Sequence, residues 1–74
     1  MKKYKSEIIN EDELIIETDT YTQDLDLGDE IKMFAVKLKH IVTGLEVAVH
    51  TYKGEIFAYN SALKKLEDKL KELR

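Results

Sequence analysis

Alternating apolar and polar residues dominate positions 31–52, and this alternation predicts a β-hairpin. Thr43-Gly44 interrupts the pattern and is typical of a turn, which would pair Val42 with Leu45. One face of the hairpin is then nearly all apolar and carries Phe34, Val36, Leu38, His40, Val42, Leu45, Val47, Val49 and Thr51. The other face is mostly polar and carries Ala35, Lys37, Lys39, Ile41, Glu46, Ala48, His50 and Tyr52. A slip of one residue would mix the two faces, so the alternation specifies the register well.

A second periodicity follows Lys53-Gly54, where apolar residues recur at intervals of three and four. These residues are Ile56, Tyr59, Leu63, Leu66, Leu70 and Leu73. The spacing predicts an amphipathic helix over residues 54–73. Asn60-Ser61 could instead cap a shorter helix, with residues 55–59 forming another strand. The continuous stripe favours the earlier start.

The first half of the chain is less regular. Residues 14–18 are short and rich in β-branched side chains, which predicts a strand. The following residues are polar and acidic and include Gly28, so we expect an acidic loop over residues 19–30. Together these elements predict one α+β domain over residues 1–74. Its two layers would be an antiparallel sheet of three to four strands and one C-terminal amphipathic helix.

Composition narrows the class of protein. The chain has 74 residues and no cysteine, which excludes disulfides and thiolate metal sites and predicts a reducing, cytoplasmic location. No apolar run approaches the ~20 residues that span a bilayer, and the basic start leads into no apolar stretch typical of a secretory signal. A core this small supplies only about 3–5 kcal/mol of stability. This leaves room for a binding target, or a second subunit in a homodimer, to add to it.

The two halves of the chain differ in charge. The formal net charge is −3, but residues 6–31 contain ten acids and no Lys or Arg, whereas residues 32–74 contain nine basic residues and five acids. Such segregation indicates opposed surface fields that can steer a charged partner. The alternative is that the charges serve solubility alone and disperse once the chain folds.

The sequence contains few residues in patterns typical of catalysis or metal binding. Residues 24–29 hint at a calcium loop, but glycine stands at the fifth position and Ala35 at the twelfth, where a bidentate glutamate is required. His40 and His50 fall on opposite faces of the predicted hairpin, so we expect His40 to be structural and His50 to be exposed. The hydroxyl residues show no nucleophile motif, and the three glycines stand alone. The sequence therefore predicts no enzyme, no catalytic residue, no metal site and no cofactor.

The order of several residues between about Ile9 and Leu66 has a further implication. The residues are Ile9-Asn10, Leu14, Ile16, Thr18, Ala35-Val36, His40, Thr43-Gly44, Val47 and Ala62-Leu63. This order resembles the catalytic domain of bacterial class I peptide chain release factors. The resemblance covers most of the chain, and its most distinctive matches are His40 and Thr43-Gly44. It implies a strand, a long loop, a hairpin that turns at Thr-Gly, and a helix.

Two departures from that family remove its chemistry. The Gly-Gly-Gln motif that promotes peptidyl-tRNA hydrolysis falls on Leu25-Asp26-Leu27, where bulky side chains and a negative charge replace it. The family's Arg-Ser-Gln at the start of the helix is replaced by Lys53-Gly54-Glu55. The resemblance thus implies a scaffold without hydrolytic function, and no catalytic residue carries over.

Two functional hypotheses remain, and neither involves a membrane or a small-molecule substrate. The first is a non-enzymatic inhibitor or adaptor that engages a basic, nucleic-acid-handling protein through its acidic N-terminal half and loop. Such a protein would resemble the small acidic proteins that phages and mobile elements encode. Its predicted contact residues are Asp19, Asp24, Asp26, Asp29 and Glu30. The second is a ribosome- or RNA-associated factor whose phosphate contacts would be Lys37, Lys39, Lys53, Lys64 and Lys65. The absence of any arginine before Arg74 weakens the second hypothesis.

Overall fold

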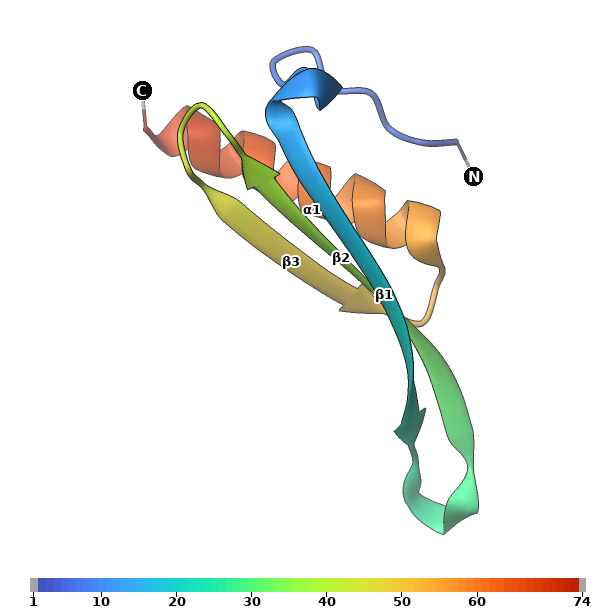
Figure 1. Cartoon of the computed structure of the whole chain (residues 1–74). Helices are drawn as coiled ribbons and strands as arrows, with labels where there is room; N and C mark the ends of the chain where they lie inside the picture. The colour runs from blue at the N-terminus through green and yellow to red at the C-terminus, as the bar shows by residue number, and fades with distance from the viewer. Residues whose placement is uncertain (1, 74) are drawn as a thin grey trace.

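The computed structural model describes residues 2–73, which form a three-stranded antiparallel sheet with one helix packed on it. The elements are β1 Leu14–Asp24, β2 Glu30–His40, β3 Glu46–Thr51 and α1 Glu55–Glu72, with short 3-10 turns at Glu11–Glu13 and Asp26–Gly28. The strands lie in the order β1-β2-β3, and α1 crosses one face of the sheet (Figure 1). This confirms the predicted α+β class. Residues 55–59 belong to α1, so the sheet has no fourth strand among the described residues.

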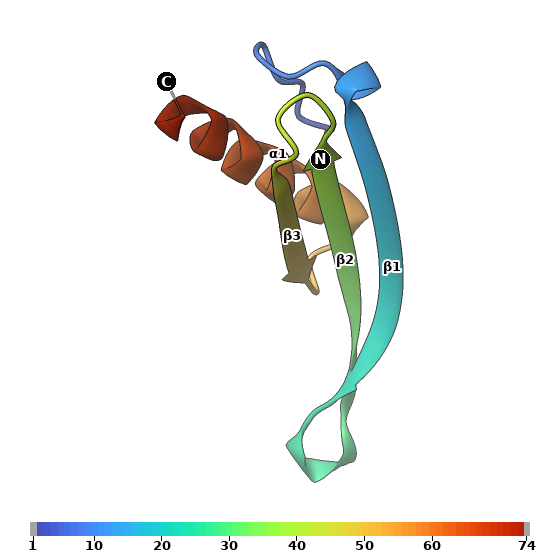
Figure 2. The same cartoon turned by 60° about the vertical axis from the view of Figure 1, so that its left-hand side comes forward.

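The core lies between α1 and the apolar face of β2 and β3, as the alternation predicts. Val36 and Leu38 of β2 are fully buried, and so are Ala62 and Leu66 of α1. The whole buried cluster is Ile9, Val36, Leu38, Val47, Val49, Ala58, Tyr59, Ala62, Leu63 and Leu66. The helix α1 packs against β2 and β3, so β1, at one edge of the sheet, is largely uncovered by it (Figure 2).

The turn between β2 and β3 is longer than predicted. Leu38 pairs with Val47 rather than with Val49, because His40 rather than Val42 pairs with Leu45. The His40 N–H donates to the Leu45 carbonyl at 2.8 Å, and Gly44, at φ 76°, donates its N–H to the His40 carbonyl at 2.7 Å. The register therefore shifts by two residues, which preserves both faces. Val42, expected on the apolar face, lies in the turn and is exposed.

The prediction of an acidic loop over residues 19–30 is wrong. Residues 19–24 complete β1 and Glu30 begins β2, so only residues 25–29 connect the two strands. Beyond the pair formed by Phe34 and Thr51, β3 has ended, and residues 21–33 continue as a two-stranded ribbon that projects from the body (Figures 1 and 2). We call residues 21–33 the arm. The arm gives the molecule its elongated shape, with extents of 47 × 23 × 18 Å.

The chain before β1 folds against α1. The Ser6 hydroxyl accepts the N–H groups of Ile8 and Ile9 at 3.2 and 3.0 Å, and this bend turns the side chain of Ile9 into the core. Asn60 of α1 accepts the Tyr4 N–H and donates its amide to the Lys2 carbonyl. The segment therefore closes one end of the core. Across residues 2–73, no helix combines the length and apolar character needed to cross a bilayer.

Candidate protein-binding surface

The tip of the arm gathers four of the five predicted acidic contact residues. Asp24 and Glu30 form the last pair of the β1–β2 ladder, and Asp26 and Asp29 lie in the connection, which a 2.7 Å bond from the Leu25 N–H to the Asp29 carbonyl closes. All four side chains are exposed. Within residues 2–73, none of them forms an ion pair. The tip is thus a dense cluster of unneutralised carboxylates.

Asp19, the fifth predicted residue, lies apart from this cluster. It pairs with Ala35 in the three-stranded part of the sheet, five residues before Asp24. At the rise of an extended strand, that separation is ~17 Å. Its carboxylate accepts the N–H of Thr20 at 2.9 Å. The sequence predicts that all five acids share one loop. In the fold, four of them lie at the tip of the arm and Asp19 lies on the side of the body.

The tip also carries an apolar residue that the sequence did not single out. Leu27 has φ 76°, and its side chain is 99% exposed. A left-handed backbone costs a leucine roughly 1–2 kcal/mol, which glycine would avoid. Leu25 beside it is also exposed. The Leu25-Asp26-Leu27 segment, where the release-factor resemblance would place Gly-Gly-Gln, therefore presents two leucines and a carboxylate at the far end of the arm.

The five lysines of the alternative hypothesis are divided between the two layers. Lys37 and Lys39 lie on the sheet face away from α1, each 3.9 Å from the carboxylate of Glu46. The remaining three lie at or on the helix. The Lys53 ammonium lies over the Phe57 ring, the Lys64 ammonium lies over the Tyr4 ring, and Lys65 is exposed. The fold therefore does not gather them into one basic surface.

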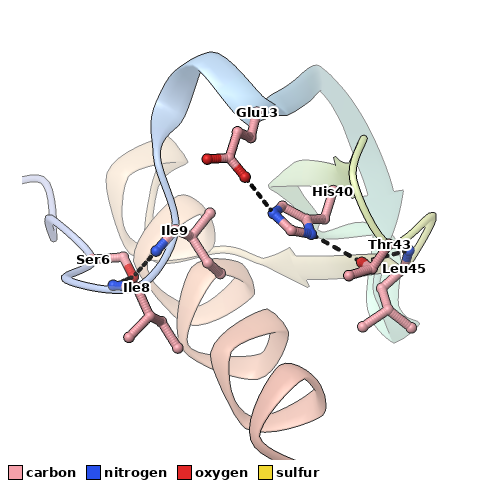
Figure 3. Close-up of polar contacts among 7 residues, drawn as sticks. All are labelled: Ser6, Ile8, Ile9, Glu13, His40, Thr43 and Leu45. Atoms are coloured by element: carbon pink, nitrogen blue, oxygen red, sulfur yellow. Dashed lines mark hydrogen bonds and ion pairs between the residues drawn. The ribbon is translucent and has the colours of Figure 1, made fainter. Parts of the chain in front are cut away.

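His40 is buried and has a partner for each ring nitrogen. Its Nδ1 lies 2.9 Å from the Thr43 hydroxyl, and its Nε2 lies 3.1 Å from the Glu13 carboxylate (Figure 3). The Thr43 hydroxyl also accepts the N–H of Leu45 at 3.3 Å. These bonds tie the β2–β3 turn to the segment before β1. The geometry agrees with the structural role expected for His40, and Thr43 and Glu13 are the partners that the sequence left unnamed.

His50 lies on the opposite face of the sheet, as expected, and is exposed. Its Nδ1 lies 3.0 Å from the Tyr21 hydroxyl, and the two rings meet edge-on with centroids 5.9 Å apart. The pair fastens the base of the arm to β3. Within the described residues, no three His, Cys, Asp or Glu side chains are arranged to hold a metal ion.

Tyr59 joins α1 to the segment before β1. Its hydroxyl donates to the Glu11 carboxylate at 3.3 Å, and the Lys3 ammonium lies over its ring at 4.5 Å. Burial, with a further contribution from Glu11, raises the pKa of Tyr59 above its ordinary value of 10.0. A hydrogen bond to Glu67 raises the pKa of Tyr4 in the same direction. The fold therefore favours both phenols in their neutral form.

This arrangement predicts a defined alkaline response. Since the folded pKa of Tyr59 is raised, its contribution to stability is complete below pH 10 and is lost as the pH rises through the folded value. Tyr59→Phe should lower the free energy of unfolding at pH 7 by about 0.5–1.5 kcal/mol, the value of the lost hydrogen bond. The difference from the unaltered protein should shrink above about pH 10. Urea unfolding at both pH values tests this, and an undiminished difference at alkaline pH would contradict it.

Comparison of the chain with protein-family models, with curated proteins and with solved structures finds no match. The release-factor resemblance therefore stays a prediction from the sequence.

Proposed function

We propose that this protein is a binding protein rather than an enzyme, an inhibitor or adaptor that engages a basic, nucleic-acid-handling protein through its acidic arm. One observation carries the proposal. Two paired strands project past the end of β3 and hold four exposed carboxylates at their tip. A surface that projects in this way can enter a groove that a flat acidic face could not.

The charge state of the tip supports a basic partner. Because the four carboxylates form no ion pairs within the described chain, a basic partner neutralises them without first breaking an internal contact. Clefts that hold a nucleic-acid backbone are lined by positive charge, which complements a cluster of carboxylates. Long-range attraction of this kind speeds association and weakens as salt is added. Leu25 and Leu27 add apolar contact area at the same end of the arm.

The ribosome- or RNA-associated alternative has weaker support. Its lysines lie on two layers, and two of them contact a carboxylate of the same sheet. A phosphate backbone would also meet the negative arm.

Affinity capture from the native host with a neutralised arm tests the proposal. The variant combines Asp24→Asn, Asp26→Asn, Asp29→Asn and Glu30→Gln, which keep the shape of each side chain and remove its charge. We expect the unaltered protein to retain a basic, nucleic-acid-handling protein and the variant to lose it. Quantitative mass spectrometry of the captured proteins gives the ratio.

A matched control separates arm charge from total charge. Glu7→Gln, Asp12→Asn, Asp68→Asn and Glu72→Gln remove four exposed carboxylates outside the arm, so both variants start from the same net charge of −3 and change it equally. The control should capture the partner as the unaltered protein does. Equal capture by the arm variant, or equal loss by the control, would contradict a role for the arm.

A further inference from the structure

β1 is an edge strand, and two backbone hydrogen bonds show which of its N–H and C=O groups face the open side. The Ile41 N–H donates to the Glu13 carbonyl at 2.8 Å, and the Leu25 N–H donates to the Asp29 carbonyl at 2.7 Å. These bonds lie in register just beyond the two ends of the β1–β2 ladder. Since bonded pairs alternate along an antiparallel ladder, the odd-numbered residues of β1 point their backbone groups at β2. The even-numbered residues point theirs away from the sheet.

The open edge of β1 therefore presents the backbone N–H and C=O groups of four successive even-numbered residues, Ile16, Thr18, Thr20 and Thr22. The bond from the Thr20 N–H to the Asp19 carboxylate agrees with this assignment, because that N–H is turned away from β2. Edge strands commonly carry lysine, proline or a bulge that blocks further pairing. β1 has none of these: eleven consecutive residues pair with β2 without interruption. Such an edge is a template for another strand.

A hollow lies beside this edge, on the side of the sheet that α1 only partly covers. It has a volume of about 270 Å³ and is lined by Lys3, Ile16, Thr18, Glu55, Ile56 and Tyr59. Ile16 and Ile56 are 41% and 45% exposed, so much of the lining is apolar surface open to solvent. A strand added to β1 would direct every second side chain toward this hollow.

The remaining side chains of an added strand would lie beside two carboxylates, one of which, Glu17, also stands opposite Lys37 in the β1–β2 ladder. Glu17 and Asp19 of β1 point to the opposite face of the sheet, and both are exposed. No described Lys, Arg or His forms an ion pair with either. Lysine or arginine at alternate positions of the added strand would lie beside them. Asp19 could then release the Thr20 N–H to the incoming strand and pair with a basic side chain.

We propose that the open edge of β1 binds an extended segment of the partner as a fourth, antiparallel strand, with apolar side chains directed into the hollow and basic side chains beside Glu17 and Asp19. In this mode, backbone bonds supply affinity and alternate side chains supply specificity. The proposal rests on the proposed function, since it takes the partner to be basic. Two registers in which a second copy of this chain could pair with the edge are unfavourable. Self-pairing about Thr18 sets Glu17 opposite Asp19, and self-pairing about Asp19 sets that carboxylate against its own copy.

The test uses the full chain and synthetic peptides of about nine residues in which lysine and valine alternate. With the peptide antiparallel to β1 and valine directed into the hollow, the valine N–H groups face β1 and the lysine N–H groups face solvent. Methylating the valine nitrogens therefore removes the donors that the edge requires. Methylating an equal number of lysine nitrogens is the matched control. Binding is followed by NMR titration at low salt.

We expect the unmodified peptide to bind and to shift the amide signals of Thr18, Thr20 and Thr22. Methylation of the valine nitrogens should weaken binding at least about tenfold, whereas methylation of the lysine nitrogens should change it less than about twofold. Equal effects of the two methylation patterns, or no binding by the unmodified peptide, would overturn strand addition. Sedimentation that shows a dimer, with the amide signals of Thr18, Thr20 and Thr22 shifting as it forms, would overturn it as well, because a second copy would then occupy the edge.

A peptide that alternates threonine and valine separates this inference from the proposed function. If it binds as tightly as the lysine peptide and shows the same dependence on methylation, strand addition stands and the preference for basic side chains beside Glu17 and Asp19 does not. If the lysine peptide binds with no dependence on methylation, attraction between charges stands and strand addition does not. We expect the threonine peptide to bind at least about threefold more weakly, since it lacks contacts with Glu17 and Asp19.

Discussion

Leu66→Ala should leave the protein largely unfolded at room temperature. Leu66 is fully buried between α1 and the sheet, so its truncation removes apolar contact and leaves a cavity in the centre of the core. Leucine-to-alanine changes at such positions cost about 2–5 kcal/mol. A core of this size supplies only about 3–5 kcal/mol in total. Circular dichroism of the helix and urea unfolding measure the effect.

Leu73→Ala is the matched control for this substitution. Leu73 is the C-cap residue of the same helix, and its side chain is 65% exposed. The same chemical change there should alter the free energy of unfolding by less than about 0.5 kcal/mol. A folded Leu66→Ala protein with unchanged urea midpoint would show that the core does not hold the domain together as described.

Shortening the arm should abolish most partner binding without unfolding the body. In the shortened protein, Asn-Gly replaces residues 22–32 and forms a two-residue turn between Tyr21 and Met33. Tyr21 and Met33 are a hydrogen-bonded pair by the alternation along the ladder, and Asn-Gly suits a tight turn between such residues. The shortened protein lacks all four acids of the tip. We expect at least about a tenfold loss of affinity for the captured partner, in line with the loss of several charge contacts.

Two measurements make this result specific. The melting temperature should change by no more than about 5 °C, a shift that corresponds to about 1 kcal/mol, because nearly all of the deleted residues are exposed. The lysine–valine peptide should still bind, because residues 16–20 of the β1 edge remain. Undiminished partner affinity in the folded, shortened protein would contradict the role of the arm.

The faces of the hairpin and the extent of the helix could be predicted because each buries one side. Val36 and Leu38 must point the same way as Val47 and Val49, and this requirement survives a register shift of two residues. The length of the turn could not be predicted in this way, because Thr43-Gly44 is also typical of a two-residue turn. In the fold, the Thr43 side chain instead bonds His40 and the Leu45 N–H, contacts that depend on the folded position of each partner.

The arm could not be predicted in the same way because neither of its faces is buried. The outer half of β1, which leads from the body into the arm, alternates threonine with acidic, aromatic and amide residues, so it shows no apolar period and resembles a polar loop. The β preference of threonine and tyrosine was the available signal. The open edge of β1 and the hollow beside it depend on where α1 packs, which no local pattern specifies. The acids of the candidate site were identified from charge alone, and their division between tip and body required the fold.

The central claim, that the acidic arm binds a basic partner, is tested most directly by titrating the captured partner with the unaltered and arm-neutralised proteins at about 0.01 M and about 0.15 M salt. We expect the unaltered protein to bind more tightly at the lower salt concentration, and the arm-neutralised protein to bind more weakly with little dependence on salt. Equal affinity of the two proteins at both salt concentrations would contradict the account.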